Sequence, residues 1–463
     1  MSALIETLAN VVKDDFRWTT MGEIADVIGG GTPRTSDPQN FEGGDIPWIT
    51  PADLSGYAEK FIAGGNRHIT RQGLASSSAR MLPAGAVLFT SRAPIGYVAI
   101  AKNPIATNQG FKSFILKEGI LPEYVYWWLK GSKQTAESYA SGTTFLELSG
   151  ANAKKLPIPM VSLARQREIV AEIEKQFSRL DEAVANLQRV KANLKRYKAS
   201  VLKDAVEGRL VPLEAELARR EGRSFETGEQ LLQRILEARR KGWKGRGAFS
   251  ESSGATVGTT DLPAGWVWTT LGQCFRVAVG ATPSRKEPSY WGGYIPWVSS
   301  GEVQLGRIRH TDEHISEAGL ANSSTQINPA GSVMIGMIGQ GKTRGQAAIL
   351  DIEAANNQNC AAIWVSRTAI LTEYVFFWLM SRYTETRSEG SGNNQQALNK
   401  RLVEQIPLPL PPLAEQQRIV AEVDRRLSLV SNVEAEIHAN LKRAQALRQA
   451  TLQRAFSKKG QHD

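Results

Sequence analysis

The chain contains the same module twice, and this repeat constrains its fold more than any other feature. The segment WTTMGEIADVIGGGTP at Trp18–Pro33 returns as WTTLGQCFRVAVGATP at Trp268–Pro283, 250 positions later. The match continues through LPEYVYWWL and LTEYVFFWL to ARQREIVAEIEKQF and AEQQRIVAEVDRRL, which start at Ala164 and Ala414. A repeat that spans most of the chain indicates a duplicated structural unit. We therefore expect two copies of one fold.

Each copy begins with a globule of short β-rich segments separated by Gly, Pro and Ser. GAVLFTS at Gly85–Ser91 and GSVMIGM at Gly331–Met337 are examples of such strands. Near its end, each globule has an aromatic helical segment, EYVYWWLKG in the first copy and EYVFFWLMS in the second. Aromatic side chains in this pattern are typical of a core. We expect Tyr124, Trp127, Tyr374 and Trp378 to be buried there.

A long amphipathic helix follows each globule. Its apolar residues recur at steps of three, four or seven, and so narrow a stripe requires a partner helix. The other copy is the obvious partner, and we expect the two helices to pair antiparallel. The connector is also long enough for a parallel pair. The residues expected to form this spacer are Ile169, Ile173, Phe177, Leu180, Leu187, Ile419, Val423, Leu427, Val430 and Ile437.

These patterns predict an α+β protein with two mixed α/β globules, separated by a pair of long antiparallel helices that form a coiled coil, as a pseudo-two-fold internal repeat. The predicted parts are an N-terminal arm (1–15), a first globule (16–158), a first spacer helix (159–206), a connector with a helix and a Gly/Ser-rich linker (207–262), a second globule (263–408), a second spacer helix (409–457) and a tail (458–463).

The chain is basic, with a formal net charge of +10 and an isoelectric point near 9.5. An excess of this sign favours an anionic partner, and nucleic acid or an acidic membrane surface are the usual candidates. No run of about 18 apolar residues offers a membrane-spanning helix, and the N-terminus does not resemble a signal peptide. The two cysteines, Cys274 and Cys360, exclude a disulfide framework and fit small buried side chains. We expect a cytoplasmic protein.

Two segments match catalytic motifs in their letters only. Gly336–Thr343 fits the phosphate-loop pattern, but a β-like run rather than a helix follows it, and Thr90–Ala101 in the first copy has no equivalent Gly-Lys-Thr. His310–His314 fits a zinc pattern, but its flanks are not helical and only His314 has a counterpart, His68. No methyltransferase motif or catalytic triad is present. We therefore expect no catalytic residue, metal or cofactor in this chain.

The run IPLPLPPLAEQQRIVAEVDRRL at Ile406–Leu427 closely resembles a boundary motif of type I restriction–modification specificity subunits. The module openings WTTLG, GATP and IPW, and the alternation of two globules with two long helices, resemble that family too. The resemblance covers about the whole chain. The first copy of the motif, PIPMVSLARQ, lacks the repeated prolines and is a degenerate version.

The resemblance implies a function without catalysis in this chain. In that family each globule is a target-recognition domain that reads one half of a bipartite, asymmetric DNA site. The paired helices set the half-site spacing and bind two methyltransferase (modification) subunits, which carry S-adenosylmethionine and methylate adenine. Restriction subunits with ATP- and Mg-dependent translocase and nuclease activity then join. The implied partners are double-stranded DNA and these subunits, and no membrane.

Residues that read DNA are expected where the two copies differ on polar, turn-rich segments, because the shared segments build the fold. Arg and Lys suit guanine edges and Asn and Gln suit adenine edges, although any of them can instead contact phosphate. The candidates are Arg34, Thr35 and Ser36 against Ser284, Arg285 and Lys286; Ser91 and Arg92 against Gln340, Lys342 and Arg344; and Thr143 and Thr144 against Asn393, Asn394, Gln395 and Gln396. Asn108-Gln109 and Asn357-Gln358 match in both copies, which indicates turn building or phosphate positioning.

Two functions of other classes stay open at this point. A coiled-coil scaffold for protein assembly predicts no salt-sensitive DNA binding by the globules. A fused restriction–modification enzyme, or a nucleotide-binding protein, predicts that the purified chain binds a cofactor.

Overall fold

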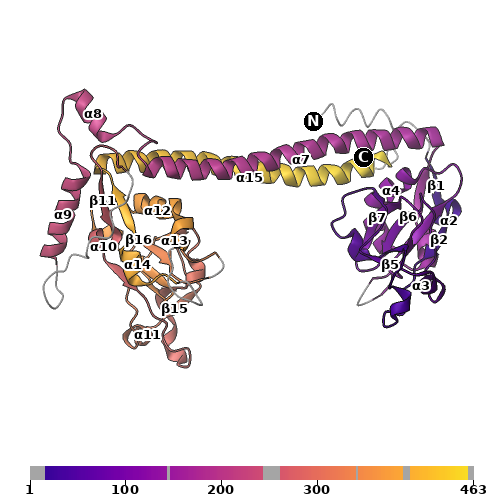
Figure 1. The fold of residues 1–463 in the computed structure, drawn as a ribbon, viewed down its shortest axis with the longest axis horizontal. Coiled ribbons are helices and arrows are strands. Elements are labelled where there is room, and N and C mark those ends of the chain that lie inside the picture. Colours follow the sequence, from indigo (N-terminus) through magenta and orange to yellow (C-terminus); the bar gives the residue numbers. More distant parts are fainter. Residues whose placement is uncertain (1–15, 143–145, 243–260, 340–341, 389–396, 457–463) are drawn as a thin grey trace. The chain divides into compact units, whose positions relative to one another are not determined.

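The computed structural model describes residues 16–142, 146–242, 261–339, 342–388 and 397–456. The chain divides into two compact units, Met1–Arg189 with Ile437–Asp463 and Val190–Glu436 (Figure 1). Each unit thus holds one globule together with part of both long helices. The predicted N-terminal arm and tail lie outside the described residues.

The first globule is built on three small sheets. The five-stranded sheet has the order β2-β9-β6-β7-β4, the three-stranded sheet β5-β3-β8, and the two-stranded sheet β1-β10. All neighbouring strands are antiparallel except the parallel pairs β4–β7 and β3–β8. The strands are β1 (Arg17–Thr20), β2 (Ala25–Gly29), β3 (Ile46–Ile49), β4 (Phe61–Ile62), β5 (Arg67–Ile69), β6 (Val87–Ser91), β7 (Ile95–Ala101), β8 (Ala106–Thr107), β9 (Lys112–Leu116) and β10 (Pro157–Met160).

The second globule repeats this topology strand for strand. Its sheets have the orders β12-β19-β16-β17-β14, β15-β13-β18 and β11-β20, with parallel pairs at the equivalent places. The predicted duplication is therefore confirmed at the level of strand order. The strands are β11 (Val267–Thr270), β12 (Val277–Val279), β13 (Trp291–Val298), β14 (Arg307–Ile308), β15 (Glu313–Ile315), β16 (Ser332–Gly336), β17 (Ala347–Leu350), β18 (Ala355–Asn356), β19 (Cys360–Ile363) and β20 (Pro407–Leu410).

Short helices cover the sheets of both globules. In the first they are α2 (Met21–Ile24), α3 (Arg71–Ala75), α4 (Pro122–Gly131), α5 (Lys133–Ser138) and α6 (Gly150–Lys155), with 3-10 turns η1 (Pro38–Asn40) and η2 (Pro51–Leu54). In the second they are α10 (Leu271–Cys274), α11 (Glu317–Ala321), α12 (Thr372–Ser381), α13 (Tyr383–Ser388) and α14 (Lys400–Glu404), with η3 (Pro288–Tyr290), η4 (Ser300–Glu302) and η5 (Val365–Arg367).

The aromatic helices α4 and α12 lie in the cores, as predicted. Tyr124 and Tyr374 are fully buried, and the Tyr374 hydroxyl donates a hydrogen bond to the Pro409 carbonyl (2.7 Å). Trp378 is also buried, whereas Trp127 is half-buried and packs against the core edge-on to Phe177. The Tyr124 hydroxyl donates in the same way to the Pro159 carbonyl. A buried hydroxyl needs such a partner, so the last strand of each globule, β10 or β20, is tied to its aromatic helix.

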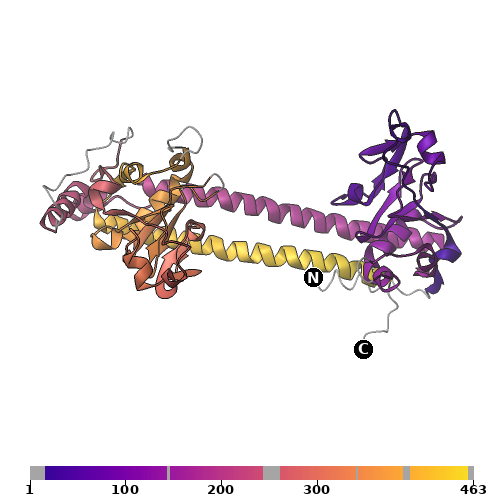
Figure 2. The same cartoon turned by 90° about the horizontal axis from the view of Figure 1, so that it is seen from below.

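The two long helices are α7 (Leu163–Val206) and α15 (Leu413–Ala455). In the first unit Asp181 of α7 pairs with Arg448 of α15, and in the second unit Lys198 pairs with Glu434 (2.7 Å). Residue numbers rise along α7 while their partners' numbers fall along α15. Within each unit the two helices lie side by side and are antiparallel, as predicted (Figures 1 and 2).

The apolar stripes of these helices do more than pair with each other. Seven of the ten predicted spacer residues are buried, and Leu180, Leu187 and Leu427 are half-buried. Ile169, Ile173 and Phe177 belong to the core of the first globule, and Ile419 and Val423 to the core of the second. The expectation that each stripe serves mainly the other helix is therefore too simple. The apolar face at the start of each helix is broad enough to pack against the globule that precedes it in the chain as well.

Within each unit, the C-terminal end of one long helix also completes the core of the globule. Leu452, Ala455 and Phe456 join the core of the first unit, where Phe456 packs edge-on against Tyr124 (5.2 Å between ring centroids). In the second unit the last turns of α7, Val201–Val206, join the core in the same way. Each globule is thus closed by helical segments from two distant parts of the sequence.

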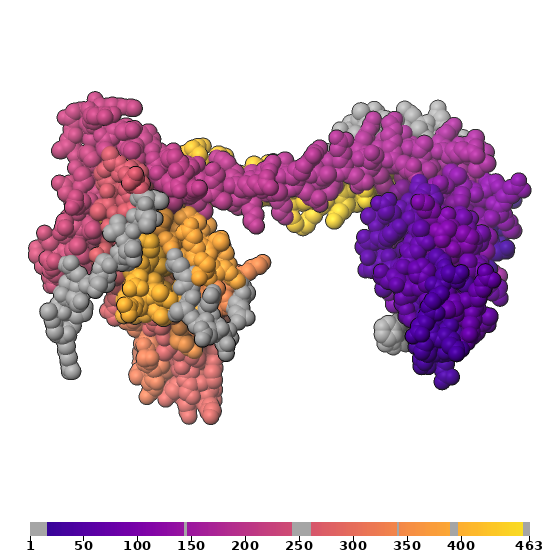
Figure 3. Space-filling view, viewed as in Figure 1, coloured from indigo at the N-terminus to yellow at the C-terminus, as the bar shows by residue number. Residues whose placement is uncertain are grey.

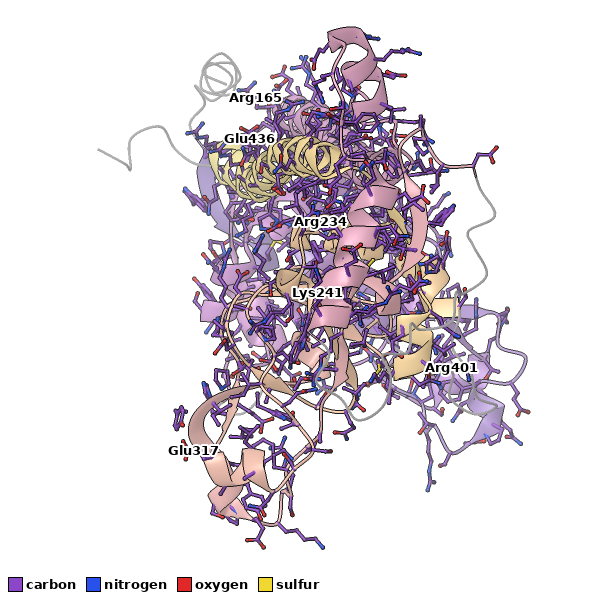
Figure 4. All side chains as sticks on the ribbon, turned by 90° about the vertical axis from the view of Figure 1, so that its left-hand side faces the viewer. Arg165, Arg234, Lys241, Glu317, Arg401 and Glu436 are labelled. Carbon is purple, nitrogen blue, oxygen red and sulfur yellow. The ribbon has the colours of Figure 1, made fainter. Side chains whose placement is uncertain are left out.

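The described part of the connector contains two helices, α8 (Glu214–Glu221) and α9 (Gly228–Lys241), both in the second unit. Leu231 and Ile235 of α9 lie in the second core, and α9 lies along one flank of that globule (Figure 3). The opposite face of α9 is charged: Arg234 and Lys241 project into solvent (Figure 4). The capping box of Thr227 and Gln230 explains why α9 begins where it does.

Both cysteines are buried and free, in agreement with the sequence interpretation. Burial raises the pKa of Cys274 to about 11 and that of Cys360 to about 12, so neither is a reactive thiolate. Among the helices of the described residues, none combines the length and apolar character required to cross a membrane.

Candidate nucleic-acid interface

The loop at residues 31–36 of the first globule is held in place by backbone contacts and by one buried indole. Trp48 Nε1 donates a hydrogen bond to the Gly31 carbonyl (2.9 Å), and Asn40 Nδ2 donates to the Arg34 carbonyl (3.0 Å). Gly31 N bonds to the Thr107 carbonyl (2.9 Å). Arg34, Thr35 and Ser36 are exposed at the turn that follows. A fixed backbone therefore presents three polar side chains to solvent.

The equivalent loop of the second globule, residues 281–286, is anchored in the same way. Trp297 Nε1 donates to the Ala281 carbonyl (3.1 Å), and Trp291 Nε1 donates to the Ser284 carbonyl (3.2 Å). Ser284, Arg285 and Lys286 are exposed. The six predicted loop residues are therefore accessible in both copies, and their contact with DNA stays a prediction.

A glycine before each loop allows the close approach of a neighbouring backbone. A Cβ atom on Gly30 would lie 1.9 Å from the Asn108 carbonyl oxygen, and one on Gly280 would lie 1.8 Å from that of Asn356. Any other residue would force the backbones apart. The loop and the turn beside it are thus built as one piece.

The matched Asn-Gln pairs build this neighbouring turn. Asn108 Oδ1 accepts a hydrogen bond from Gly110 N (2.9 Å), and Asn357 Oδ1 accepts one from Asn359 N (3.0 Å). The adjacent glutamines bond to the loops, Gln109 to Thr32 and Gln358 to Thr282. The turn-building interpretation of these pairs is confirmed.

Of the second group of candidates in the first globule, Ser91 is not accessible. It lies at the end of β6, inside the five-stranded sheet, and its hydroxyl donates to the Gly110 carbonyl (3.1 Å). The prediction that it reads DNA is wrong for this structure, because β6 is the central strand of its sheet and all its residues, Ser91 included, are buried. Arg92, the next residue, is partly exposed and pairs with Glu147 (3.4 Å). Burial lowers the pKa of the nearby Lys112, and the Arg92 charge adds to this while Glu147 opposes it.

In the second globule, too, one candidate of this group is exposed and another is buried. Lys342 is exposed on a turn, whereas Arg344 is buried, so the expectation that Arg344 is available to DNA on a polar turn is wrong for this structure. The turn folds back onto the sheet, since Gly345 N bonds to the Gly336 carbonyl (2.8 Å) and the Tyr383 hydroxyl bonds to the Lys342 carbonyl (2.6 Å). The remaining candidates lie outside the described residues: Gln340, Thr143, Thr144, Asn393, Asn394, Gln395 and Gln396.

The two catalytic look-alikes have no catalytic geometry. After Gly336 the described part of the phosphate-loop segment is a turn followed by strand β17, so no helix N-terminus faces a phosphate. His310 is in a loop and His314 lies on β15 rather than on a helix. No cluster of three or more potential metal ligands (His, Cys, Asp or Glu) occurs among the residues that the structure describes.

Sequence reasoning missed the residues that carry the loops. Trp48 and Trp297 were visible only as part of the shared IPW motif, and their indole hydrogen bonds to the loop backbone required the structure. It also missed Glu313, which forms an ion pair with Arg285 in the second globule. The hydrogen bond from Arg285 lowers the pKa of the Glu313 carboxyl, although burial opposes this slightly.

Comparison with known proteins matches both copies of the module to one family. The model of the type I restriction modification DNA specificity domain matches residues 13–196 and again 263–443. The chain belongs to the type I restriction–modification DNA specificity family. The resemblance found in the sequence is thereby confirmed, and the two globules are the two target-recognition domains of a specificity subunit.

Individual relatives support this assignment along most of the chain. The type I restriction enzyme MjaIX specificity subunit of Methanocaldococcus jannaschii is 27% identical over 380 residues, which are 82% of this chain and 78% of the relative. A chain from a structure of type I R-M system assembly matches with a TM-score of 0.62 and 20% identity, covering 95% of this chain and 97% of the other. The HsdS subunit from Thermoanaerobacter tengcongensis matches with a TM-score of 0.52 and 19% identity, covering 96% and 97%. The last two show the fold.

Proposed function

We propose that each target-recognition domain reads one half of a bipartite, asymmetric site in double-stranded DNA. The observation that carries this proposal is the pair of anchored loops, 31–36 and 281–286, built on the same backbone but bearing different exposed side chains. Equivalent frames with unlike polar side chains suit two unrelated half-sites. The net charge of +10 supports an anionic partner.

We further propose that α7 and α15 set the half-site spacing and scaffold two methyltransferase subunits, to which restriction/translocase subunits bind. A helix of 44 residues such as α7 is about 66 Å long at about 1.5 Å per residue. Half-sites one DNA turn apart lie about 34–36 Å from centre to centre, so a spacer of this kind has the required scale. S-adenosylmethionine, ATP and Mg would be bound by the partner subunits, and this chain would carry no catalytic group. The complex would act in the cytoplasm.

The direct test is to co-express the chain with its methyltransferase subunits and to map methylated adenines over a genome. The expected result is one bipartite motif with a fixed spacer. Methylation without any motif, or motif-specific methylation by the methyltransferase subunits alone, would contradict the proposal. If the assembled complex shows no salt-sensitive DNA binding, the protein-scaffold alternative is favoured instead.

The ruler function is tested by lengthening both helices together. Seven residues inserted after Arg189 and seven after Glu436, which are exposed and where the two compact units divide, add about 10 Å and nearly preserve the helical face. The mapped motif should gain about three base pairs of spacer at about 3.4 Å each. An active complex with an unchanged spacer length would exclude the ruler.

A further inference from the structure

In both target-recognition domains a guanidinium lies over the same pair of aromatic rings. The first domain places Arg67 over Phe41 (4.5 Å to the ring centroid) and over Trp48 (5.2 Å). The second domain places Arg285 over Trp291 (3.7 Å) and over Trp297 (5.4 Å). We call these ring pairs, Phe41 with Trp48 and Trp291 with Trp297, the aromatic platforms.

The rings are equivalent in the repeat, but the arginines are not. Arg67 lies on β5 directly opposite Trp48, and the residue opposite Trp297 on β15 is Glu313. Arg285 comes from the loop instead, where the first domain has Thr35. The position of the cation in space is therefore retained although its origin in the chain has changed. A structural need of the platform alone does not require this, since both indoles are already satisfied by backbone carbonyls.

Stacking prepares a guanidinium for planar recognition. The ring covers one face of the cation and limits its rotation, while the N–H donors stay directed outward along its edge. Arg67 is exposed, and the side chain of Arg285 is 54% exposed. In each globule the three-stranded sheet that carries the platform lies at the end away from the long helices (Figure 1). Among the described residues, both guanidinium groups are therefore accessible to a ligand at this end.

The two platforms differ in what occupies the guanidinium edge. Among the described residues no carboxylate pairs with Arg67, whose guanidinium contacts the two rings. Arg285 is engaged by both oxygens of Glu313, with Nη2 at 2.8 Å from Oε2 and Nη1 on Oε1. The first platform presents a free cation, and the second presents a closed ion pair.

We propose that the aromatic platforms are DNA-contact sites, with Arg67 donating to a guanine edge in one half-site and Glu313 acting as a positioning residue that restrains Arg285 in the other. Guanine O6 and N7 match the fork of a stacked arginine. In the second domain a DNA acceptor has to displace Glu313, which makes binding weaker there and more dependent on the correct base. This inference rests on the proposed function, because it assumes that each globule reads DNA.

The first test uses the full chain assembled with its methyltransferase subunits. Arg67→Ala should reduce methylation of the native motif about tenfold or more and relax one guanine position in one half-site only. Arg67→Lys, which keeps the charge but loses the fork, should not restore that position. The matched control is Arg17→Ala, which removes an exposed arginine from β1, outside the platform, and should leave the motif unchanged.

Several outcomes would overturn the assignment of Arg67. Arg67→Ala with an unchanged motif and unchanged affinity would exclude a DNA contact. Arg67→Ala could instead weaken DNA binding equally for all sequences, with binding restored in Arg67→Lys. That result would make Arg67 a phosphate contact and overturn the base-reading role. An equal loss in the Arg17→Ala control would reduce the effect to net charge. If even the unaltered complex methylates no defined motif, the proposed function itself fails.

The second test addresses Glu313. Glu313→Gln frees the Arg285 fork with little change in volume, so the complex should bind random-sequence duplex DNA several-fold more tightly. The second half of the methylated motif should become less stringent, while the half affected by Arg67→Ala stays unchanged. Unchanged binding together with an unchanged motif would show that Glu313 does not restrain a DNA contact.

Discussion

The two units share every strand of their globules, yet they differ in how they hold their charges. In both, an indole fixes the backbone of the loop, Trp48 in the first and Trp297 in the second. The first leaves Arg67 without a described carboxylate partner, whereas the second closes Arg285 against Glu313. Duplication thus preserved the contacts that set backbone geometry and left the exposed charges free to diverge. The two loops therefore have similarly anchored backbones but different exposed side chains.

The long helices show a second difference at their first turns. Glu415 of α15 is buried and accepts hydrogen bonds from Trp266 Nε1 (2.9 Å) and from Glu214 N (2.8 Å). Glu214, also buried, pairs with Arg223 (2.6 Å) and Arg418 (2.7 Å). The positions of α7 that are equivalent to Glu415 and Arg418 hold Arg165 and Glu168, which pair with each other. The second unit therefore uses buried carboxylates to fasten its connector, and the first has no such connector among its described residues.

The largest expected effect concerns the helix ends that close the two cores. Phe456→Ala should destabilise the first unit by about 3–5 kcal/mol, because it removes a buried ring packed on Tyr124 and Trp128. Val206→Ala, at the equivalent position 250 residues earlier, should cost the second unit about 2 kcal/mol. Urea unfolding followed by hydrogen exchange in each unit measures both. Equal costs in the two units would contradict the expected difference between a buried ring and a buried valine at these helix ends.

An intermediate effect is expected at the connector. Glu214→Gln should weaken the docking of α8 by about 1–3 kcal/mol, because two arginines lose a buried carboxylate. The matched control is Lys175→Ala, an exposed lysine that pairs with the half-buried Glu172 one turn away, which should cost about 0.5 kcal/mol or less. Hydrogen exchange of residues 214–241 is the measurement. Protection that is unchanged in Glu214→Gln would contradict the fastening role.

The same carboxylate predicts a pH dependence. Burial raises the pKa of Glu214, but the hydrogen bonds from Arg223 and Arg418 outweigh it, so its net pKa is lowered. Because the folded pKa lies below the unfolded one, the stabilisation is present above the ordinary glutamate range and is lost as the pH falls through the lowered pKa. Protection of residues 214–241 should therefore decline on acidification, and Glu214→Gln should remove this part of the decline.

The smallest effect is expected at the second platform. A double-mutant cycle of Arg285→Gln and Glu313→Gln should give a coupling of about 0.2–1 kcal/mol, since both side chains are exposed and screened by solvent. The hydrogen bond from Arg285 lowers the pKa of Glu313, so the coupling should vanish as the pH falls through that lowered pKa. A coupling that persists in acid would show that the interaction is not ionic.

Much of this fold could be predicted from the sequence because the repeat gives two independent sequence patterns for most structural elements. The duplicated globules, the antiparallel helices and the turn-building role of Asn108 and Asn357 were accessible in that way. The burial of Ser91 and Arg344 was not, because polar residues at strand ends and turns look alike in sequence whether they face solvent or fold back. The arginine exchange was also hidden. Arg67 and Arg285 occupy unrelated chain positions and meet equivalent rings only in the folded globules, Arg67 from a strand and Arg285 from a loop.

The closing of each core by the far end of the other helix has a consequence for the order of folding during synthesis. The second globule receives Val201–Val206, which the ribosome has already made, whereas the first must wait for Leu452 and Phe456. At about 5–20 residues per second that delay is on the order of tens of seconds. During this time Tyr124 and Trp128 lack their final aromatic neighbour, so the domain translated first is the one completed last.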